Sequence, residues 1–223
     1  FNEVHTIKQI IKEVRNQEIK DIEIIVVDDY STDGTRDLLK NKLFKDIDKI
    51  IYHKKNKGKG AAIRSAQKFI NGDIVIIQDA DLEYDPKDYV KLIEPINAHN
   101  TKVVYGSRVI KNKKYFSKNF ISLSRIFFNH MLTIFSNIIN NQNLSDAHTC
   151  YKMFDSTVFK SLKLCEDDFA FCPEVTSKIS RLKLEIIEVQ ISYNGRTMDE
   201  GKKIGIIDGF RALYVLIKYR FIK

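Results

Sequence analysis

Short aliphatic runs alternate with stretches whose apolar residues recur every three or four positions through the first half of the chain. The runs are rich in isoleucine and valine and predict buried strands within 23–27, 49–53, 72–78 and 101–105. The periodic stretches predict helices at 4–17, 35–43, 57–70 and 86–97. This alternation indicates an α/β fold with a mainly parallel sheet and helices on both faces.

The second half of the chain is mainly helical by the same criterion. Helices are predicted at 119–139, 157–162, 173–182 and 205–219, with a polar loop at 144–152 and a strand at 185–192. We expect the apolar helix 119–139 to pack in the core or against a second copy of the chain, or to rest on lipid. The last helix is aromatic and basic, so it could lie among lipid headgroups or pack on the sheet.

Composition narrows the class of protein. The 223 residues and a hydrophobic fraction of 43% fit one domain, which we divide into a half at about 1–108 and a half at about 109–223. Three cysteines without zinc-site spacing favour a reducing, cytoplasmic compartment. Lysine and arginine outnumber the acids by 37 to 29, and this net charge of +8 suits an anionic partner. The sequence has no uncharged apolar run of about 20 residues, so we expect no membrane span.

Carboxylates follow two of the predicted strands directly. Asp28 and Asp29 end the first strand, and Asp79-Ala80-Asp81 ends the central one, at the sheet edge where open α/β folds bind ligands. If strand geometry continues through Ala80, Asp79 and Asp81 point to the same side about 7 Å apart and repel each other unless a cation lies between them. This donor set suits Mg²⁺ or Mn²⁺ with a substrate diphosphate. The alternative is an acidic turn that caps the next helix.

Glycines surround a lysine where the helix 57–70 begins. Gly58 and Gly60 would let backbone amides approach a phosphate, and Lys59 would add positive charge. Many connections between strand and helix need such glycines simply to turn, so this segment is weak evidence alone.

A series of motifs runs along the chain in a characteristic order. They are Phe1-Asn2-Glu3, Val27-Asp28-Asp29-x-Ser31-x-Asp33-Gly34-Thr35, Gly58-Lys59-Gly60-x-Ala62, Gln78-Asp79-Ala80-Asp81-Leu82-Glu83, Gly106-Ser107-Arg108, Asp146-x-x-Thr149-Cys150-Tyr151-Lys152-x-Phe154 and Arg196-x-x-x-Glu200-Gly201-Lys202-Lys203-Ile204. Together they resemble family 2 glycosyltransferases of the GT-A fold, and among these the dolichyl- or polyprenyl-phosphate sugar synthases. The resemblance implies inverting transfer of a sugar from a nucleoside-diphosphate sugar.

The resemblance also implies roles for single residues. Those expected to bind the nucleotide sugar are Asn2, Glu3, Asp28, Asp29, Lys59, Asp79, Ala80 and Asp81. Those expected to hold the metal are Asp79, Asp81 and Glu83. Arg108, Arg125 and Arg196 match basic positions that would face the diphosphate or the acceptor phosphate. We expect catalysis to depend most on Asp81, Arg108 and Arg196. The resemblance also implies a strand before the Asn2-Glu3 turn, so we expect that this first strand is missing from the sequence ahead of Phe1.

The acceptor decides whether a general base is needed. A lipid monophosphate, with a second pKa near 6, is already largely ionised, whereas a hydroxyl must lose a proton to a carboxylate. The acidic pair that serves sugar acceptors in the family is replaced here by Cys172-Pro173-Glu174, with Asp167-Asp168 shortly before it. This favours transfer to a polyprenyl (dolichyl-type) phosphate.

Two alternatives stay open: transfer to a glycan hydroxyl in surface polysaccharide synthesis, and a non-catalytic nucleotide-sugar-binding domain. The expected partners are a nucleoside-diphosphate sugar and a lipid phosphate. A peripheral position on the cytoplasmic face of a membrane and a homo-oligomer are compatible with the sequence, and we expect no nucleic acid partner.

Overall fold

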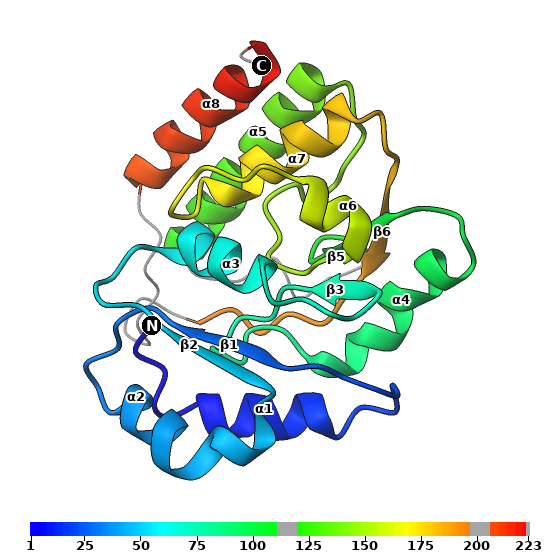
Figure 1. The fold of residues 1–223 in the computed structure, drawn as a ribbon. Helices are drawn as coiled ribbons and strands as arrows, with labels where there is room; N and C mark the ends of the chain where they lie inside the picture. Colours follow the sequence, from blue (N-terminus) through cyan, green and yellow to red (C-terminus); the bar gives the residue numbers. More distant parts are fainter. Residues whose placement is uncertain (111–119, 197–205, 222–223) are drawn as a thin grey trace.

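The computed structural model describes residues 1–110, 120–196 and 206–221, with the backbone alone for 120–125 and 206–208 (Figure 1). Its strands are β1 (Ile25–Asp28), β2 (Lys49–Tyr52), β3 (Ile74–Ile76), β4 (Val103–Ser107), β5 (Lys152–Asp155) and β6 (Ile186–Gln190). Its α-helices are α1 (Ile7–Arg15), α2 (Thr35–Leu38), α3 (Lys59–Gln67), α4 (Tyr89–Asn97), α5 (Phe120–Asn140), α6 (Ser156–Ser161), α7 (Phe171–Arg181) and α8 (Ile206–Phe221). A π-helical turn at Leu39–Leu43 and a 3₁₀ turn at Phe44–Asp46 follow α2, and a 3₁₀ turn at Pro86–Asp88 precedes α4.

The strands form two sheets, a parallel pair of β1 and β2 and a four-stranded mixed sheet, rather than one mainly parallel sheet. β1 pairs in parallel with β2, placing Ile25 opposite Lys49, and β4 pairs in parallel with β6. β5 lies between β3 and β4 and runs antiparallel to both, in the order β3-β5-β4-β6. The expected α/β architecture is present, and the expectation of a mainly parallel sheet is corrected by this one strand.

The sequence gives little signal for β5. It has four residues, begins with a lysine and follows a polar loop, so neither alternation nor an aliphatic run marks it. Lys152 is fully buried all the same, with Nζ 3.4 Å from the centre of the Tyr105 ring and 2.9 Å from the Ala147 carbonyl oxygen. Tertiary contacts, not local pattern, make this segment a strand.

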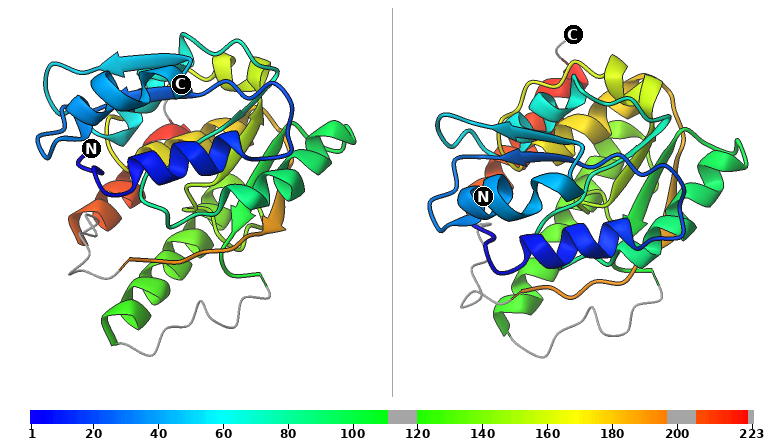
Figure 2. Two further views of the ribbon diagram at one scale, coloured as in Figure 1. Left: turned by 90° about the horizontal axis from the view of Figure 1, so that it is seen from below. Right: turned by 60° about the horizontal axis from the view of Figure 1, so that its bottom comes forward.

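Apolar side chains from the four-stranded sheet form cores on both of its faces. Val104 and Met153 pack with α1 and α4 in one core, which also holds Leu92. Val103 and Phe154, their neighbours in sequence, point the other way into a core built with α6 and α7. This alternation is what a strand covered by helices on both sides requires. Figure 2 shows these helix layers from two further directions.

β1 and β3 lie on opposite sides of a cavity and do not pair with each other. Consecutive residues of both segments, 22–29 and 72–81, line the cavity, so two strand edges border it. Over the described part of the chain, no helix combines the length and the apolar character needed to cross a bilayer.

Candidate functional site

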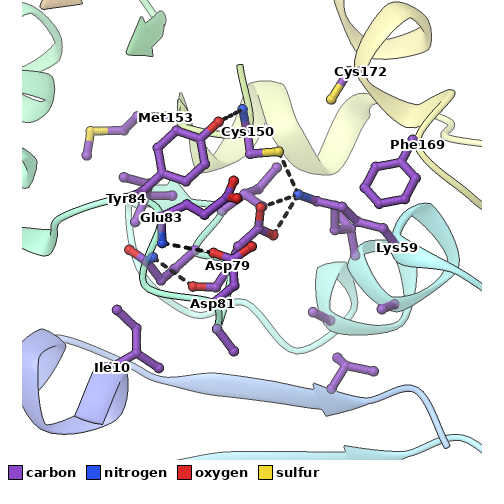
Figure 3. Close-up of a pocket in the computed structure, with 18 of the residues that line it drawn as sticks. Ile10, Lys59, Asp79, Asp81, Glu83, Tyr84, Cys150, Met153, Phe169 and Cys172 are labelled. Carbon is purple, nitrogen blue, oxygen red and sulfur yellow. Dashed lines mark hydrogen bonds and ion pairs between the residues drawn. The ribbon is translucent and has the colours of Figure 1, made fainter. Parts of the chain in front are cut away.

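A cavity of about 2090 Å³ contains the motif carboxylates and reaches from the two strand edges to α5 and α8. Figure 3 shows part of its wall, where Asp79, Asp81 and Glu83 lie near Lys59, Tyr84 and Cys150. Arg108 and Arg196 also line it. Apolar side chains make up most of the remaining wall, and we use the name charged patch for Asp79, Asp81, Glu83, Lys59, Arg108 and Arg196 together.

The loop that carries the motif is not a continuation of the strand. β3 ends at Ile76, and Ala80 and Asp81 lie in a turn followed by Leu82 at φ 59°. The condition under which strand geometry would place Asp79 and Asp81 on one side is therefore not met. The turn still places both carboxylates at the cavity, where Asp79 pairs with Lys59 and Asp81 pairs with Arg196.

Asp79 forms an ion pair with Lys59. Lys59 Nζ lies 2.6 and 2.7 Å from the two carboxylate oxygens and 2.9 Å from Cys150 Sγ (Figure 3). Burial alone would lower the pKa of Lys59, but the Asp79 charge holds it well above its ordinary value. The pair is thus ionised, and Lys59 neutralises Asp79.

The Gly58 and Gly60 positions have a structural explanation that differs from phosphate binding. Gly58 has φ +95°, and a Cβ atom there would lie 2.4 Å from the Asp167 carbonyl oxygen. A Cβ atom at Gly60 would lie 2.2 Å from the Glu166 carbonyl oxygen. The Ala61 amide donates to the Asp167 carbonyl at 3.0 Å. The start of α3 therefore packs against the 166–167 backbone, which only glycine permits at these positions.

Arg196 connects three carboxylates of the site. Its guanidinium lies 3.0 Å from Asp81 Oδ2 and 3.2 Å from both carboxylate oxygens of Glu3, while its backbone amide donates to Glu83 at 2.8 Å. Glu83 also accepts a hydrogen bond from the Tyr193 hydroxyl at 2.9 Å. Glu3 and Arg196, which are 193 positions apart in the sequence, therefore meet in this site.

The electrostatics around Asp81 favour a cation. Burial, followed by the charges of Asp79 and Glu83, raises the pKa of Asp81 to about 6 despite the nearby Arg196. A carboxylate with excess negative charge around it is a donor that Mg²⁺ or Mn²⁺ would stabilise, and such ions commonly use one or two protein carboxylates with substrate oxygens. Asp79 and Asp81 fit this pattern.

The expected third ligand, Glu83, does not join them in a ready-made cluster. Across the described residues, no group of three or more histidine, cysteine or acidic side chains is arranged to hold a metal ion. Glu83 instead holds the Arg196 amide and the Tyr193 hydroxyl. Its role as a ligand stays a prediction, and the structure gives it a second role in anchoring the 193–196 segment.

Arg108 is built into the cavity wall by a buried pair. Its Nε and Nη2 atoms donate to the two oxygens of Asp146 at 2.7 and 2.8 Å, and its guanidinium lies 5.1 Å from the centre of the Tyr193 ring. Burial would raise the pKa of Asp146, but the charge and hydrogen bonds of Arg108 bring it below its ordinary value. The side chain of Arg125, expected beside a phosphate, lies outside the described residues.

The amino-terminal turn is fastened to the turn after β1. The backbone amides of Asn2 and Glu3 donate to Ser31 Oγ and Thr35 Oγ1, both at 2.9 Å. The Asn2 side-chain oxygen accepts from the Thr32 amide at 2.9 Å. The two turns expected to bind the nucleotide therefore form one unit, which the sequence order alone did not reveal.

Asp28 and Asp29 have internal partners. Asp28 pairs with Arg36 at 2.6 Å, and Asp29 accepts from the Lys57 and Gly58 amides and lies 2.6 Å from His53 Nδ1. Both carboxylates are almost fully buried, although they border the cavity. The structure thus gives them a positioning role, and the expected contacts with base or ribose stay predictions.

Glu174, the candidate general base for a hydroxyl acceptor, is fully buried and lies outside the cavity lining. Its carboxylate accepts from the backbone amides of Cys165 and Glu166 at 2.6 and 2.9 Å and pairs with Lys178 at 2.6 Å. Asp168 caps the Ala170 amide at 2.9 Å and pairs with Arg211 at 2.5 Å. These acidic groups hold the segment before α7 in place.

Sequence reasoning missed several residues of the site. Cys150, Tyr84 and Tyr193 surround the carboxylates, with the Tyr84 and Tyr193 rings 5.2 Å apart and the Cys150 amide donating to the Tyr84 hydroxyl at 3.1 Å. Phe169 borders the same cavity (Figure 3). Cys150 lies inside a motif, which was a usable signal. The tyrosines come from separate segments, and only the fold brings them together.

Comparison with known proteins gives consistent results. The model of the family described as Glycosyl transferase family 2 matches residues 1–163. A UDP-N-acetylglucosamine–dolichyl-phosphate N-acetylglucosaminyltransferase from Methanococcus voltae is 29% identical over 97% of this chain and 92% of its own length. A dolichol-phosphate mannosyltransferase from Pyrococcus furiosus is 26% identical over 98% of this chain, which spans 62% of that relative. An undecaprenyl-phosphate mannosyltransferase from Micrococcus luteus is 24% identical over 94% of this chain and 86% of its length.

The fold is also found among solved structures. Glucosyl-3-phosphoglycerate synthase from Mycobacterium tuberculosis, in complex with Mn²⁺, UDP-glucose and phosphoglyceric acid, matches all of this chain and 78% of its own, with a TM-score of 0.73 and 17% identity. This confirms the expected α/β fold of the GT-A type.

Proposed function

The chain belongs to glycosyl transferase family 2, and we propose that it transfers a sugar from a nucleoside-diphosphate sugar to a polyprenyl phosphate. The relatives from M. voltae, P. furiosus and M. luteus carry names with dolichyl or undecaprenyl phosphate as acceptor and match nearly the whole chain. The likeness therefore extends into the half that would meet the acceptor. We assign the reaction inversion at the anomeric carbon and a divalent metal ion.

The charged patch of the cavity has the chemistry that this reaction needs. An acceptor phosphate oxygen forms a bond to the anomeric carbon, and the bond from that carbon to the diphosphate breaks, with the electron pair leaving on the diphosphate. A metal ion held by Asp79 and Asp81 would supply positive charge next to that leaving group. Lys59 and Arg196 pair with the same carboxylates, so they lie where phosphate oxygens could take over their hydrogen bonds.

The observation that carries the choice of acceptor is the position of Glu174. Its carboxylate is buried, engaged with two amides and Lys178, and outside the cavity lining, so it is unsuited to remove a proton from a hydroxyl. A phosphate nucleophile needs no such group because it is already largely ionised above pH 6. Residues that position two anions then matter more than a base.

The test is a product assay with radiolabelled UDP- and GDP-sugars, Mn²⁺ and a polyprenyl phosphate. We expect label to move into the organic phase after extraction, as an acid-labile lipid-linked sugar. Label that stays in the aqueous phase on an oligosaccharide acceptor would support transfer to a glycan hydroxyl instead. Hydrolysis to free sugar with neither product would refute both forms of transfer.

Glu174→Gln should reduce stability rather than catalysis. An amide at this position keeps one acceptor oxygen but turns its NH₂ group toward a backbone N–H and loses the Lys178 pair, which costs about 1–3 kcal/mol. We expect the melting temperature to fall by about 2–4 °C per kcal/mol lost, with kcat of the folded protein within about threefold of wild type.

The matched control is Glu94→Gln, at an exposed glutamate on α4, which should change neither the melting temperature nor kcat. The melting temperature is taken from a thermal unfolding curve, and kcat is measured at a temperature well below the transition. A Glu174→Gln protein that binds donor normally, melts normally and transfers nothing would make Glu174 the base and reverse the choice of acceptor.

Lys59→Met should change metal binding in opposite directions with and without nucleotide. Removing Lys59 leaves Asp79 without its cation, so Mn²⁺ alone should bind about tenfold more tightly, a change of about 1.4 kcal/mol. With UDP present the gain should shrink or reverse, because the diphosphate also loses a cationic partner.

Mn²⁺ titrations followed by electron paramagnetic resonance, with and without UDP, measure both effects. Lys57→Met removes an exposed lysine of the same loop and serves as the control. Equal Mn²⁺ affinity in Lys59→Met and Lys57→Met would argue against a metal ion beside Asp79.

A further inference from the structure

Helix α5 has its polar and apolar faces reversed relative to an ordinary surface helix. Its buried positions include Thr133, Ser136 and Asn140. Its exposed positions include an apolar row at Phe127, Met131, Ile134 and Ile138, with Phe128 beside it, and these side chains are 41% to 75% exposed. A surface helix normally buries its apolar stripe and exposes its polar residues. The reversal indicates that the outer face of α5 meets an apolar medium.

Helix α8 carries a second row with the same spacing. Phe210, Tyr214, Ile217 and Phe221 recur at intervals of four, three and four residues, as the α5 row does, and are 45% to 75% exposed. A row over eleven residues of helix is about 16 Å long. Unlike α5, α8 has an apolar inner face as well, with Val215 and Leu216 buried. We call these two sets the apolar rows.

The apolar rows border the opening of the cavity. α5 and α8 pack against each other and against α7. Phe127, Phe128 and Met131 of α5 and Phe210 of α8 are exposed and also line the cavity that contains Asp79 and Asp81. The cavity therefore reaches the surface between the first halves of the two rows, and one continuous space joins an apolar rim to the charged patch.

We propose that the apolar rows rest on the surface of an anionic lipid bilayer, so that a lipid phosphate enters the cavity between α5 and α8. This inference rests on the proposed function for the identity of the lipid, but the surface contact is tested separately. A bilayer would cover both rows and still deliver a ligand with a phosphate and an apolar tail to the opening. A second copy of the chain seated on both rows would instead cover that opening.

The net charge of the chain and the residue types in the apolar rows both agree with contact with an anionic bilayer. The chain has a net charge of +8, which draws it toward anionic headgroups. The rows are rich in phenylalanine and tyrosine, which are favoured at the boundary between headgroups and acyl chains. Arg211 and Lys218 of α8 already pair with acids of the 166–168 segment, so we assign the attraction to the overall charge rather than to these two side chains.

The test is co-sedimentation with vesicles of phosphatidylcholine, with and without phosphatidylglycerol, and with no donor or acceptor. We expect wild-type protein to bind the anionic vesicles in preference. One variant, Ile134→Ser with Ile138→Ser, alters the α5 row, and another, Tyr214→Ser with Phe221→Ser, alters the α8 row. Neither includes a residue that lines the cavity. Each should lower the bound fraction about fivefold or more, since two apolar side chains are lost from the contact.

The matched control is Phe44→Ser with Val90→Ser, which removes two comparably exposed apolar side chains away from α5 and α8. It should bind vesicles as wild type does. Melting temperatures of all variants should stay near that of the wild type because the altered residues are exposed. If either row variant unfolds, the variant on the other helix still decides the outcome.

Two results would overturn the inference. One is vesicle binding that the row variants do not change, or that the control variant lowers equally. The other is a dimer, seen by light scattering, that the row variants convert to monomer without any effect on vesicles, which would assign the rows to a second copy.

Transfer assays separate this inference from the proposed function. With a short, water-soluble isoprenyl phosphate the row variants should keep wild-type rates, and with a long-chain acceptor in vesicles they should lose activity in parallel with binding. No transfer to either acceptor, with vesicle binding intact in the wild type, would refute the proposed function and leave the surface contact standing. Equal transfer to both acceptors by all variants would refute the surface contact alone.

Discussion

Asp81→Asn is expected to lower kcat about 100-fold or more, equivalent to about 3 kcal/mol of transition-state stabilisation. Asparagine keeps the size of the side chain but removes the charge that would hold a metal ion. In the structure Asp81 also faces Arg196 at 3.0 Å, so the substitution frees that guanidinium for Glu3 or for a phosphate. Part of the binding energy for the diphosphate should therefore survive while catalysis is lost.

Donor affinity measured with and without Mn²⁺ gives the sharper readout for Asp81→Asn. We expect the stimulation by Mn²⁺ to disappear while metal-free nucleotide binding stays within a few-fold of wild type. Asp37→Asn, an exposed carboxylate in the first turn of α2, is the control for losing one negative charge. An Asp81→Asn protein with near-normal, metal-dependent turnover would show that the metal is bound elsewhere.

Arg196→Ala is expected to raise the acceptor KM or lower kcat by a factor of about 10–100, as the loss of a charged hydrogen bond of about 1.5–3 kcal/mol predicts. Arg196 contacts Glu3 and Asp81, so the structure allows two explanations for such a loss. The guanidinium could bind a phosphate directly, or it could act only by holding the amino-terminal turn against the motif loop.

A double-mutant cycle with Glu3→Gln separates these explanations. If Arg196 acts only through Glu3, each single variant should lose as much activity as the double variant. If Arg196 binds phosphate, Glu3→Gln should cost much less, and Arg196→Lys should recover part of the activity by restoring the charge without the two-pronged geometry. Arg15→Ala, at an ion pair outside the cavity, controls for the general loss of an arginine. An unchanged KM and kcat in Arg196→Ala would remove Arg196 from the site.

Long, regular patterns in the sequence predicted the corresponding elements well, and short or irregular ones were missed. The helix predicted at 119–139 is α5 at Phe120–Asn140, and the strand predicted at 185–192 contains β6. The helix predicted at 35–43 begins as α2 and changes to a wider turn after Leu38. β5 was missed because four residues beginning with a buried lysine carry no periodic signal.

Motif order and hydrophobic period are local properties of the chain, so the family and the α/β fold class could be predicted from the sequence, and the charged residues near the motifs could be named as candidates. The sequence could not determine which charges meet. Asp79 with Lys59, Asp81 with Arg196, and Arg108 with Asp146 are separated by 20, 115 and 38 positions. It also could not show that Glu174 is buried outside the cavity lining or that α5 buries Thr133, Ser136 and Asn140. These depend on how helices and strands pack, since the direction of a side chain is set by its neighbours in space.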